Sequence, residues 1–165
     1  MEEVIIRQAS EKDIPNIQEI AFSTWPSAYA AILSKEQLHY MLDLFYAAES
    51  LKGQMKDGHE FYMAETDRYT IGFASISQIN EDTYKLQKLY VLPAAQKTGA
   101  GKALIEFVIE RVREYGARAI QLNVNRHNKA IRFYEKRGFV VIKEDDINIG
   151  NEYYMNDYVM EKKLF

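Results

Sequence analysis

Residues 85–107 constrain the fold more than any other segment, because a strand, a proline, a glycine-containing turn and an amphipathic helix follow one another directly. The pattern predicts a strand over 83–91 and a helix over 101–115, ended at Gly116. Glycines let backbone N–H groups approach a ligand closely, and a helix N-terminus carries partial positive charge. The segment therefore predicts an anion-binding turn over 96–101.

The glycine spacing in this turn excludes two familiar nucleotide-binding motifs. A Walker loop needs a glycine, four residues, and then glycine, lysine and Ser/Thr, which this chain lacks here. The dinucleotide fingerprint needs a third glycine where this chain has Leu104. A plainer alternative stays open at this point, in which Gly99 and Gly101 only shape the loop and let the helix pack on the sheet.

The rest of the chain alternates strand-like and helix-like patterns without a repeat, linker or low-complexity tract. Two capping signals, Ser10 with Asp13 and Ser34 with Gln37, precede apolar residues at helical spacing and predict two early helices. Further patterns predict strands at 4–8, 61–66, 70–78, 119–124, 139–143 and 158–164, a hairpin turn at Asp67-Arg68, and a helix over 128–137. We expect a single domain, 1–165, of the α+β class with a mixed sheet.

Composition excludes several functional classes. The chain has no cysteine, which removes disulfides, thiolate zinc sites and cysteine nucleophiles. Its net charge of −3 offers no general attraction to nucleic acid or to an anionic membrane, and no apolar run approaches the roughly 20 residues of a membrane span. The first residues do not read as a secretory signal, so we expect a cytoplasmic protein.

Histidine does not predict a metal centre in this chain. His39 and His59 are isolated, and neither has a partner at ligand spacing. His127 is a possible acid–base group by its ordinary pKa, but it lies between Arg126 and the Asn128-Lys129 pair, as a solvated surface histidine would. We expect no metal.

Two motifs in order carry a resemblance to a known family. The turn QKTGAG resembles the Q/R-x-x-G-x-G/A acyl-CoA pyrophosphate loop of the GNAT superfamily of N-acetyltransferases, and NKAIRFYEKRGF resembles the later helix of that family. The resemblance is close from about Leu86 to Phe139. It implies a mostly antiparallel central sheet flanked by helices, with two splayed parallel strands, 83–91 and 119–124, that form a slot for the co-substrate acetyl-CoA.

The resemblance also implies a set of co-substrate-binding residues. Backbone groups of Leu89, Tyr90 and Val91 would pair with the pantetheine arm as an added strand does. The pyrophosphate would be held by Gln96, Lys97, Thr98, Gly99, Ala100 and Gly101, with help from the charge of Lys102. Asn128 would meet the arm or an ordered water, although Asn125 is the other counterpart of the family's asparagine.

Tyr134 is the catalytic residue that the resemblance implies. It would lie near the thioester sulfur and donate a proton to the departing thiolate. The alternative is a half-buried aromatic whose hydroxyl is satisfied elsewhere. A backbone N–H near Val91 would polarise the acetyl oxygen, and direct transfer without an acyl-enzyme is expected.

The general base is not identified by the sequence. Many members of the family carry a glutamate on the strand before the loop, but here the stretch Lys85-Leu86-Gln87-Lys88 holds no carboxylate. Gln87 cannot take up a proton and would only position a water. A water relay to Glu60, Glu65 or Asp157, or the absence of a dedicated base, are the open alternatives.

The acceptor is predicted only as a class. Trp25, Tyr29, Tyr62, Tyr153 and Tyr154 are candidates for lining its site, because aromatic faces hold cationic amines, although all five are equally suited to an ordinary core or surface. We expect acetyl transfer to a primary amine of a small molecule, with polyamine-like acceptors included. A non-catalytic acyl-CoA-binding regulatory module and a protein or peptide N-acetyltransferase are the alternatives, and the chain is expected to be a monomer or a homodimer.

Overall fold

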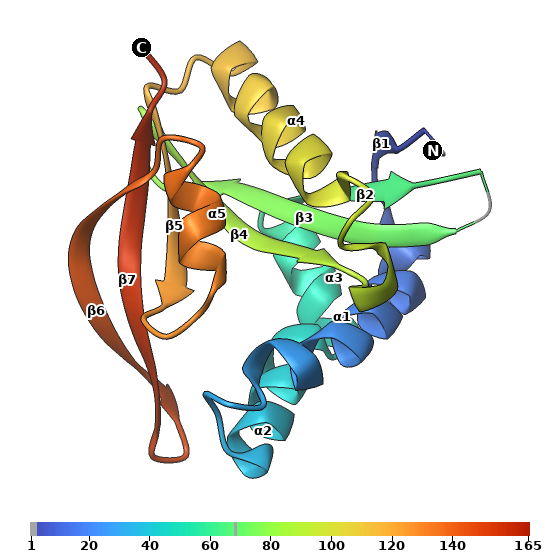
Figure 1. The fold of residues 1–165 in the computed structure, drawn as a ribbon, viewed down its shortest axis with the longest axis vertical. Helices are drawn as coiled ribbons and strands as arrows, with labels where there is room; N and C mark the ends of the chain where they lie inside the picture. Colours follow the sequence, from blue (N-terminus) through green and yellow to red (C-terminus); the bar gives the residue numbers. More distant parts are fainter. Residues whose placement is uncertain (1–2, 68) are drawn as a thin grey trace.

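A computed structural model describes residues 3–67 and 69–165 and shows one seven-stranded sheet in the order β1-β2-β3-β4-β5-β7-β6 (Figure 1). The strands are β1 (Ile5–Gln8), β2 (Glu60–Glu65), β3 (Thr70–Gln78), β4 (Thr83–Val91), β5 (Ala119–Asn125), β6 (Val140–Gly150) and β7 (Tyr153–Lys163). The helices are α1 (Ile14–Tyr29), α2 (Lys35–Tyr46), α3 (Ala48–Lys56), α4 (Ala100–Glu114) and α5 (Ala130–Glu135).

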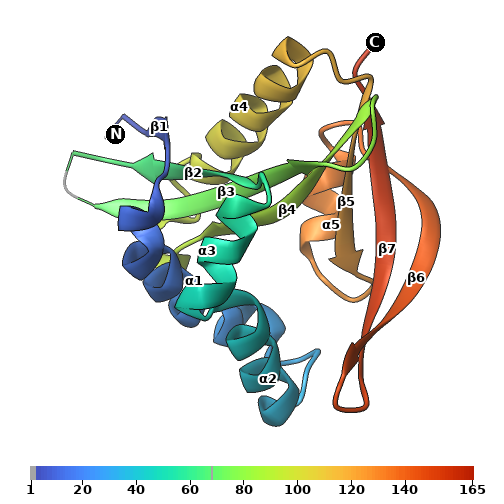
Figure 2. The same ribbon diagram turned by 180° about the vertical axis from the view of Figure 1, so that it is seen from behind.

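Five of the six strand pairs are antiparallel, and β4 with β5 is the parallel one. The expected α+β fold with a mostly antiparallel sheet is therefore confirmed. Helices α1, α2 and α3 cover one face of the sheet, while α4 and α5 lie on the other (Figures 1 and 2). Burial of apolar side chains on both faces accounts for this layered arrangement.

Each face of the sheet has its own apolar core. One cluster joins the apolar side of α4, including Leu104 and Val108, to strand residues such as Ile76. The other joins α1 and α2, through residues such as Ile17, to Phe73 of β3. Because both faces are covered, β3 is buried along nearly its whole length.

The predicted capping signals are both present. Ser10 and Asp13 form a reciprocal capping box, which opens a single 3-10 turn that leads into α1. The hydroxyl of Ser34 accepts a hydrogen bond from the backbone N–H of Gln37 at 3.1 Å, at the start of α2. These side chains satisfy donors that a helix N-terminus leaves open, which fixes where both helices begin.

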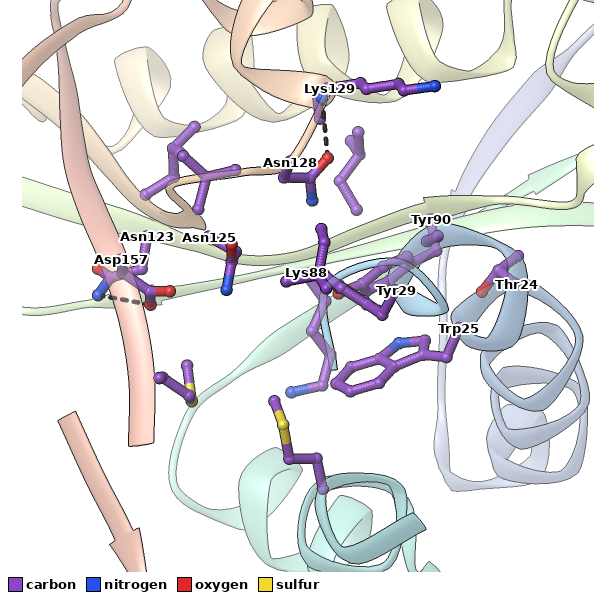
Figure 3. Close-up of a pocket in the computed structure, with 18 of the residues that line it drawn as sticks. Thr24, Trp25, Tyr29, Lys88, Tyr90, Asn123, Asn125, Asn128, Lys129 and Asp157 are labelled. Atoms are coloured by element: carbon purple, nitrogen blue, oxygen red, sulfur yellow. Dashed lines mark hydrogen bonds between the residues drawn. The ribbon is translucent and has the colours of Figure 1, made fainter. Parts of the chain in front are cut away.

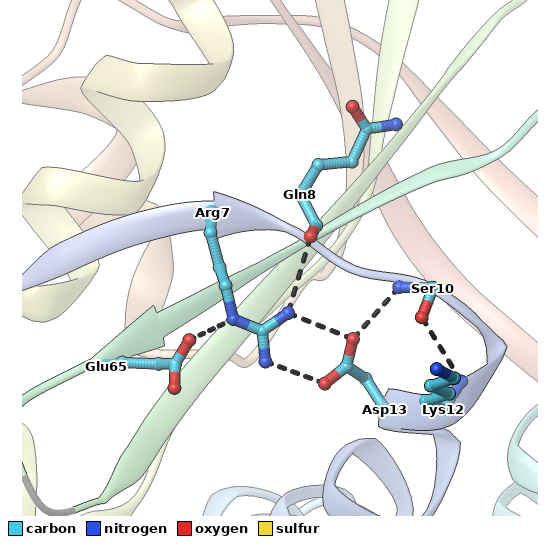
Figure 4. A network of polar contacts seen from close by, with 6 residues as sticks. All are labelled: Arg7, Gln8, Ser10, Lys12, Asp13 and Glu65. Atoms are coloured by element: carbon cyan, nitrogen blue, oxygen red, sulfur yellow. Dashed lines mark hydrogen bonds and ion pairs between the residues drawn. The ribbon is translucent and has the colours of Figure 1, made fainter.

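Asp13 also joins β1 to the start of α1 (Figure 4). The guanidinium of Arg7 donates to both carboxylate oxygens of Asp13, at 2.7 and 3.0 Å, and pairs with Glu65 on the neighbouring strand. The Arg7 hydrogen bonds hold the pKa of Asp13 below its ordinary value, in spite of an opposing effect of burial. The Arg7 guanidinium therefore connects β1, β2 and the start of α1.

Three features of the fold differ from the sequence prediction. Helix α3 was not predicted, because its residues are mostly polar and Leu51 is its one buried residue. Helix α5 is shorter than the predicted 128–137. The predicted strands at 139–143 and 158–164 are parts of the longer β6 and β7, which pair along one hairpin.

The β6–β7 hairpin escaped prediction for a physical reason. β6 is one of the two edge strands, and most of its residues are exposed; Val140, for example, has 61% of its surface accessible. No apolar–polar alternation therefore marks the strand. The turn uses left-handed backbone at Gly150, Asn151 and Glu152. Glutamate is unusual in that conformation, so the sequence does not predict the turn either.

The hairpin that the sequence does predict is confirmed, since β2 and β3 are antiparallel neighbours. Arg68 of its predicted turn lies outside the described residues. Within the described ranges, none of the helices combines the length and the apolar character that crossing a bilayer requires.

Candidate active site

The sheet opens between its two parallel strands. β4 and β5 face each other at four positions, from Thr83 opposite Ala119 to Leu86 opposite Leu122. Beyond these pairs β4 continues along β3, whereas β5 continues along β7. A cavity of about 830 Å³ lies at this opening and extends between α1, α2 and β7.

One edge of β4 presents backbone groups to the opening. The N–H of Leu92 donates to the carbonyl of Ile71 on β3 at 2.8 Å. Because backbone groups alternate in direction along a strand, the N–H of Tyr90 also faces β3, and those of Leu89 and Val91 face away from it. The latter two are suited to an extended ligand arm that pairs as a strand would.

The turn before α4 has the geometry of an anion site. Gly99 has φ +85°, a left-handed conformation that glycine adopts without strain, and it directly precedes the helix. The first N–H groups of a helix lack acceptors within it and point out from its end. The hydroxyl of Thr98 donates to the Ala95 carbonyl at 2.6 Å, which stabilises the turn.

The predicted co-substrate residues fall into two groups. Seven line the cavity: Leu89, Tyr90, Val91, Gln96, Gly101, Asn128 and Tyr134. The others form the adjoining turn and first helical residues: Lys97, Thr98, Gly99, Ala100 and Lys102. The first group includes the exposed β4 edge and the second the helix N-terminus, so the set fits an extended arm that ends in a pyrophosphate.

Tyr134 lies on α5 and contributes to the cavity wall, with 8% of its surface exposed. Its ring packs edge-on against Phe133 and Phe139, with centroids 5.3 and 5.7 Å away. Burial raises the pKa of its hydroxyl well above the ordinary value, and Tyr29 contributes in the same direction. The phenol therefore keeps its proton at neutral pH and can act as a donor.

The two asparagines that competed for one role have different partners. The side-chain oxygen of Asn128 accepts from the Ala130 N–H at 2.8 Å, at the start of α5 (Figure 3). That of Asn125 accepts from the His127 N–H at 2.9 Å. Both residues line the cavity. In each, the side-chain oxygen accepts a hydrogen bond from the loop backbone, so the amide nitrogen can still donate to a ligand.

The structure separates the three carboxylates considered as bases. Glu60 accepts hydrogen bonds from the hydroxyls of Tyr62 and Tyr115, at 2.9 and 2.6 Å, and Glu65 pairs with Arg7. Asp157 is the one carboxylate that lines the cavity among residues 3–67 and 69–165.

Asp157 projects from β7 with 3% of its surface exposed (Figure 3). Burial raises its pKa above the ordinary value, while a hydrogen bond from Asn123 at 3.4 Å acts in the opposite direction. A carboxyl group with a raised pKa at a cavity wall is suited to accepting a proton. Gln87, on the strand where a glutamate was expected, donates to the Ser77 hydroxyl at 2.9 Å.

Three of the five predicted acceptor aromatics line the cavity, namely Trp25, Tyr29 and Tyr154. The rings of Trp25 and Tyr29 have centroids 4.8 Å apart, and the Tyr29 hydroxyl lies 2.9 Å from that of Tyr90. The structure does not bring the other two there: Tyr62 packs against Phe107 of α4, and Tyr153 packs against Tyr40 of α2.

Several residues of the cavity were not predicted from the sequence. Met41, Phe45 and Tyr46 of α2 contribute to its wall, and so does Lys88 of β4. Figure 3 shows Lys88 between Asp157 on one side and Trp25 on the other. Lys88 could have been predicted to line the cavity, because it precedes Tyr90 by two residues and the side chains of both therefore lie on the same face of β4.

Comparison with known proteins points to one family. Residues 29–157 match the family model described as an acetyltransferase (GNAT) domain. An N-acetyltransferase of Mycobacterium tuberculosis is 29% identical over 92% of this chain and 98% of the relative, and a spermidine N(1)-acetyltransferase of Thermoplasma acidophilum is 28% identical over 96% of each. The crystal structure of a PaiA N-acetyltransferase from Thermoplasma acidophilum, in complex with coenzyme A, superposes with a TM-score of 0.82 at 28% identity, over 98% of this chain and 99% of that one.

Proposed function

Because the chain belongs to the GNAT family and is an acetyl-CoA-dependent N-acetyltransferase, we propose that it transfers the acetyl group to a primary amine of a small molecule. One observation carries the small-molecule proposal. Contacts between α2 and the β6–β7 hairpin bridge the acceptor end of the cavity, which favours a compact acceptor over the extended peptide that an open groove would hold.

These contacts, which we call the α2–hairpin bridge, involve two side chains of α2. The Tyr40 hydroxyl donates to the Ile149 carbonyl at 2.7 Å, and the Gln37 amide donates to the Tyr154 carbonyl at 2.9 Å. The Tyr40 ring also packs against Tyr153 at 5.2 Å between centroids. A cavity walled in this way suits a compact acceptor better than an extended chain.

In the proposed mechanism one side chain accepts a proton and another donates one. Acetyl-CoA supplies an activated acetyl thioester. Asp157 receives a proton from the acceptor ammonium through water, which leaves a neutral amine, and a second proton is lost from the nitrogen to solvent as the new C–N bond forms. Tyr134 donates its proton to the sulfur as the C–S bond breaks, and solvent restores both groups. The products are an N-acetylated amine and a free thiol.

The co-substrate would be held by the residues that the family resemblance implies. The N–H groups of Leu89 and Val91 would pair with the pantetheine arm, and the turn over 96–101 with the α4 N-terminus would hold the pyrophosphate. Gly101 supports this assignment, since it lines the cavity and an added Cβ there would lie 3.7 Å from the Phe133 ring. The missing side chain thus keeps space open beside α4.

Polyamines remain one class of acceptor to be tested. Similarity to the spermidine N(1)-acetyltransferase, at 28% identity over 96% of the chain, is the observation that favours them. The aromatic faces of Trp25 and Tyr29 are also compatible with a cationic amine.

Release of free thiol from acetyl-CoA tests the proposal. The panel comprises spermidine, free amino acids, aromatic amines and short peptides, with the wild-type protein and Tyr134→Phe. We expect turnover with a small amine, a fall in kcat of roughly 100-fold in the variant, and little change in KM for acetyl-CoA. Efficient turnover of peptides alone would contradict the small-molecule acceptor, and coenzyme A binding without turnover of any amine would favour a regulatory module.

A further inference from the structure

Lys88 places a positive charge in the acceptor end of the cavity without a matching carboxylate. Its Nζ lies 5.3 Å from the centroid of the Tyr46 ring and 5.9 Å from that of Phe61. Across the described parts of the chain, no carboxylate oxygen comes within 4.0 Å of this nitrogen. Aromatic faces stabilise an ammonium only weakly compared with a counter-ion, so the charge is left largely uncompensated.

The neighbours of Lys88 make this environment more positive. Burial, with a smaller contribution from the charge of Lys85 on the same strand, lowers the pKa of Lys88 to about 8. Lys85 also lines the cavity, but its own charge is partly offset by Asp157 and Asp145. His59 lies immediately before β2. Burial is the larger cause that lowers the pKa of His59, and the charge of Lys88 is the next.

His59 is a second polar group near Lys88 whose hydrogen bonding is incomplete. The Nδ1 atom of His59 is buried and has no hydrogen-bond partner within the described ranges. A buried polar atom without a partner is uncommon in native proteins. Neither His59 nor the rings of Tyr46 and Phe61 supply a negative charge that would balance the Lys88 ammonium.

We propose that the acceptor of this N-acetyltransferase carries a carboxylate beside its amine, and that Lys88 binds this carboxylate. The inference rests on the proposed function and specifies its substrate class as amino-acid-like. A carboxylate supplies the counter-ion that the Lys88 ammonium lacks, whereas a polyamine brings further positive charge against Lys85 and Lys88.

The layout of the cavity suits such a zwitterion. Asp157 and Lys88 project from β7 and β4, the two strands that border this end of the cavity, and Trp25 of α1 lies beyond Lys88 (Figure 3). The amine would be directed toward Asp157 and the carboxylate toward Lys88. The rings of Trp25 and Tyr46, with centroids 5.6 Å apart, would contact the apolar part of the acceptor.

Binding of a matched pair of probes tests the carboxylate site without requiring turnover. The probes are 3-phenylpropanoate and 3-phenylpropanamide, which differ in charge but hardly in shape. Calorimetry with the coenzyme A complex gives their affinities, and the fluorescence of Trp25, the single tryptophan, reports on the same site. We expect the carboxylate to bind about tenfold more tightly than the amide, a preference that corresponds to one charge-assisted hydrogen bond.

Three variants locate the source of this preference. Lys88→Met should abolish it, Lys88→Arg should retain it, and Lys163→Met, which removes a charge from an exposed position on β7, should leave it unchanged. The preference should also decline as the pH rises through about 8, where Lys88 loses its proton. Equal affinity for the two probes, or a preference that survives Lys88→Met, would overturn the inference.

Turnover distinguishes failure of this inference from failure of the proposed function. Phenylalanine, phenylalaninamide and spermidine are compared as acceptors by thiol release. We expect kcat/KM to be highest for phenylalanine and to fall about tenfold for it alone in Lys88→Met. Faster turnover of spermidine or of the amide would overturn the carboxylate proposal and leave the enzyme assignment intact, whereas no turnover of any amine would count against the proposed function itself.

Discussion

Leu86 and Leu122 form the last pair of facing residues between β4 and β5, and beyond them the two strands separate. The co-substrate arm is proposed to use the β4 edge that this separation exposes. We therefore predict that coenzyme A slows hydrogen exchange at the amides of Leu89 and Val91. The Tyr90 amide faces β3 and should be protected with or without the ligand. Residue-specific NMR measurement would count against the proposed arm position if all three amides responded alike.

Gly99 and Gly101 should respond differently to the same substitution. Gly99→Ala places a side chain on a residue with φ +85°, so we expect a loss of about 1 kcal/mol in the free energy of unfolding and weaker coenzyme A binding. Gly101→Ala adds a Cβ at ordinary contact distance from Phe133 and should leave the fold nearly unchanged. Urea denaturation and calorimetry with coenzyme A measure both effects. Equal stability of the two variants would contradict the assigned role of the left-handed turn.

Asp157→Asn should raise stability while it lowers activity. Burial raises the pKa of this carboxyl in the folded state, so the ionised form costs stability at neutral pH, and that cost disappears as the pH falls below the unfolded pKa of about 3.9. We expect the variant to be more stable than the wild type near pH 7 and equally stable in acid. Its kcat should fall roughly 100-fold or more if Asp157 is the base. Unchanged kcat would remove Asp157 from the mechanism.

Asp13→Asn should show the opposite dependence on pH. The pKa of Asp13 is lowered in the folded state by Arg7, so its stabilising effect is present above the unfolded pKa of about 3.9 and is lost as the pH falls through the lower folded value. We expect a loss of roughly 1–2 kcal/mol at neutral pH, because the ion pair and part of the capping box are both removed. Urea denaturation across this pH range measures the loss. A difference that persisted unchanged into strong acid would contradict the role of the ionised carboxylate.

Sequence prediction was most complete where function depends on local backbone geometry. The strand of 83–91, the glycine turn and the following helix lie together in the chain, so their pattern predicts both the local fold and the proposed anion site. Tyr134 could be singled out because the motif around it resembles a family motif. The contact of Ser34 with Gln37 was predictable for the same local reason.

The acceptor end could not be predicted in the same way, because its residues come from distant segments. Asp157 was one of three candidate bases until the pairing of β7 with β5 placed it in the cavity. The sequence does not show that Trp25 lines the cavity and Tyr62 does not, because the side chain of a strand residue such as Tyr62 can face either side of the sheet. Lys88 belongs to no motif, and only the assembled cavity shows that no carboxylate of residues 3–67 and 69–165 pairs with it.

The two ends of the cavity are built by different parts of the chain. The end proposed for acetyl-CoA comes from β4, α4 and α5, whereas Trp25, Met41 and Tyr154 belong to α1, α2 and β7. Mutations in these latter elements can change the acceptor without disturbing the donor site. New acceptor specificities in such a scaffold can therefore arise largely by divergence of its first and last segments, together with single positions of the middle segment such as Lys88.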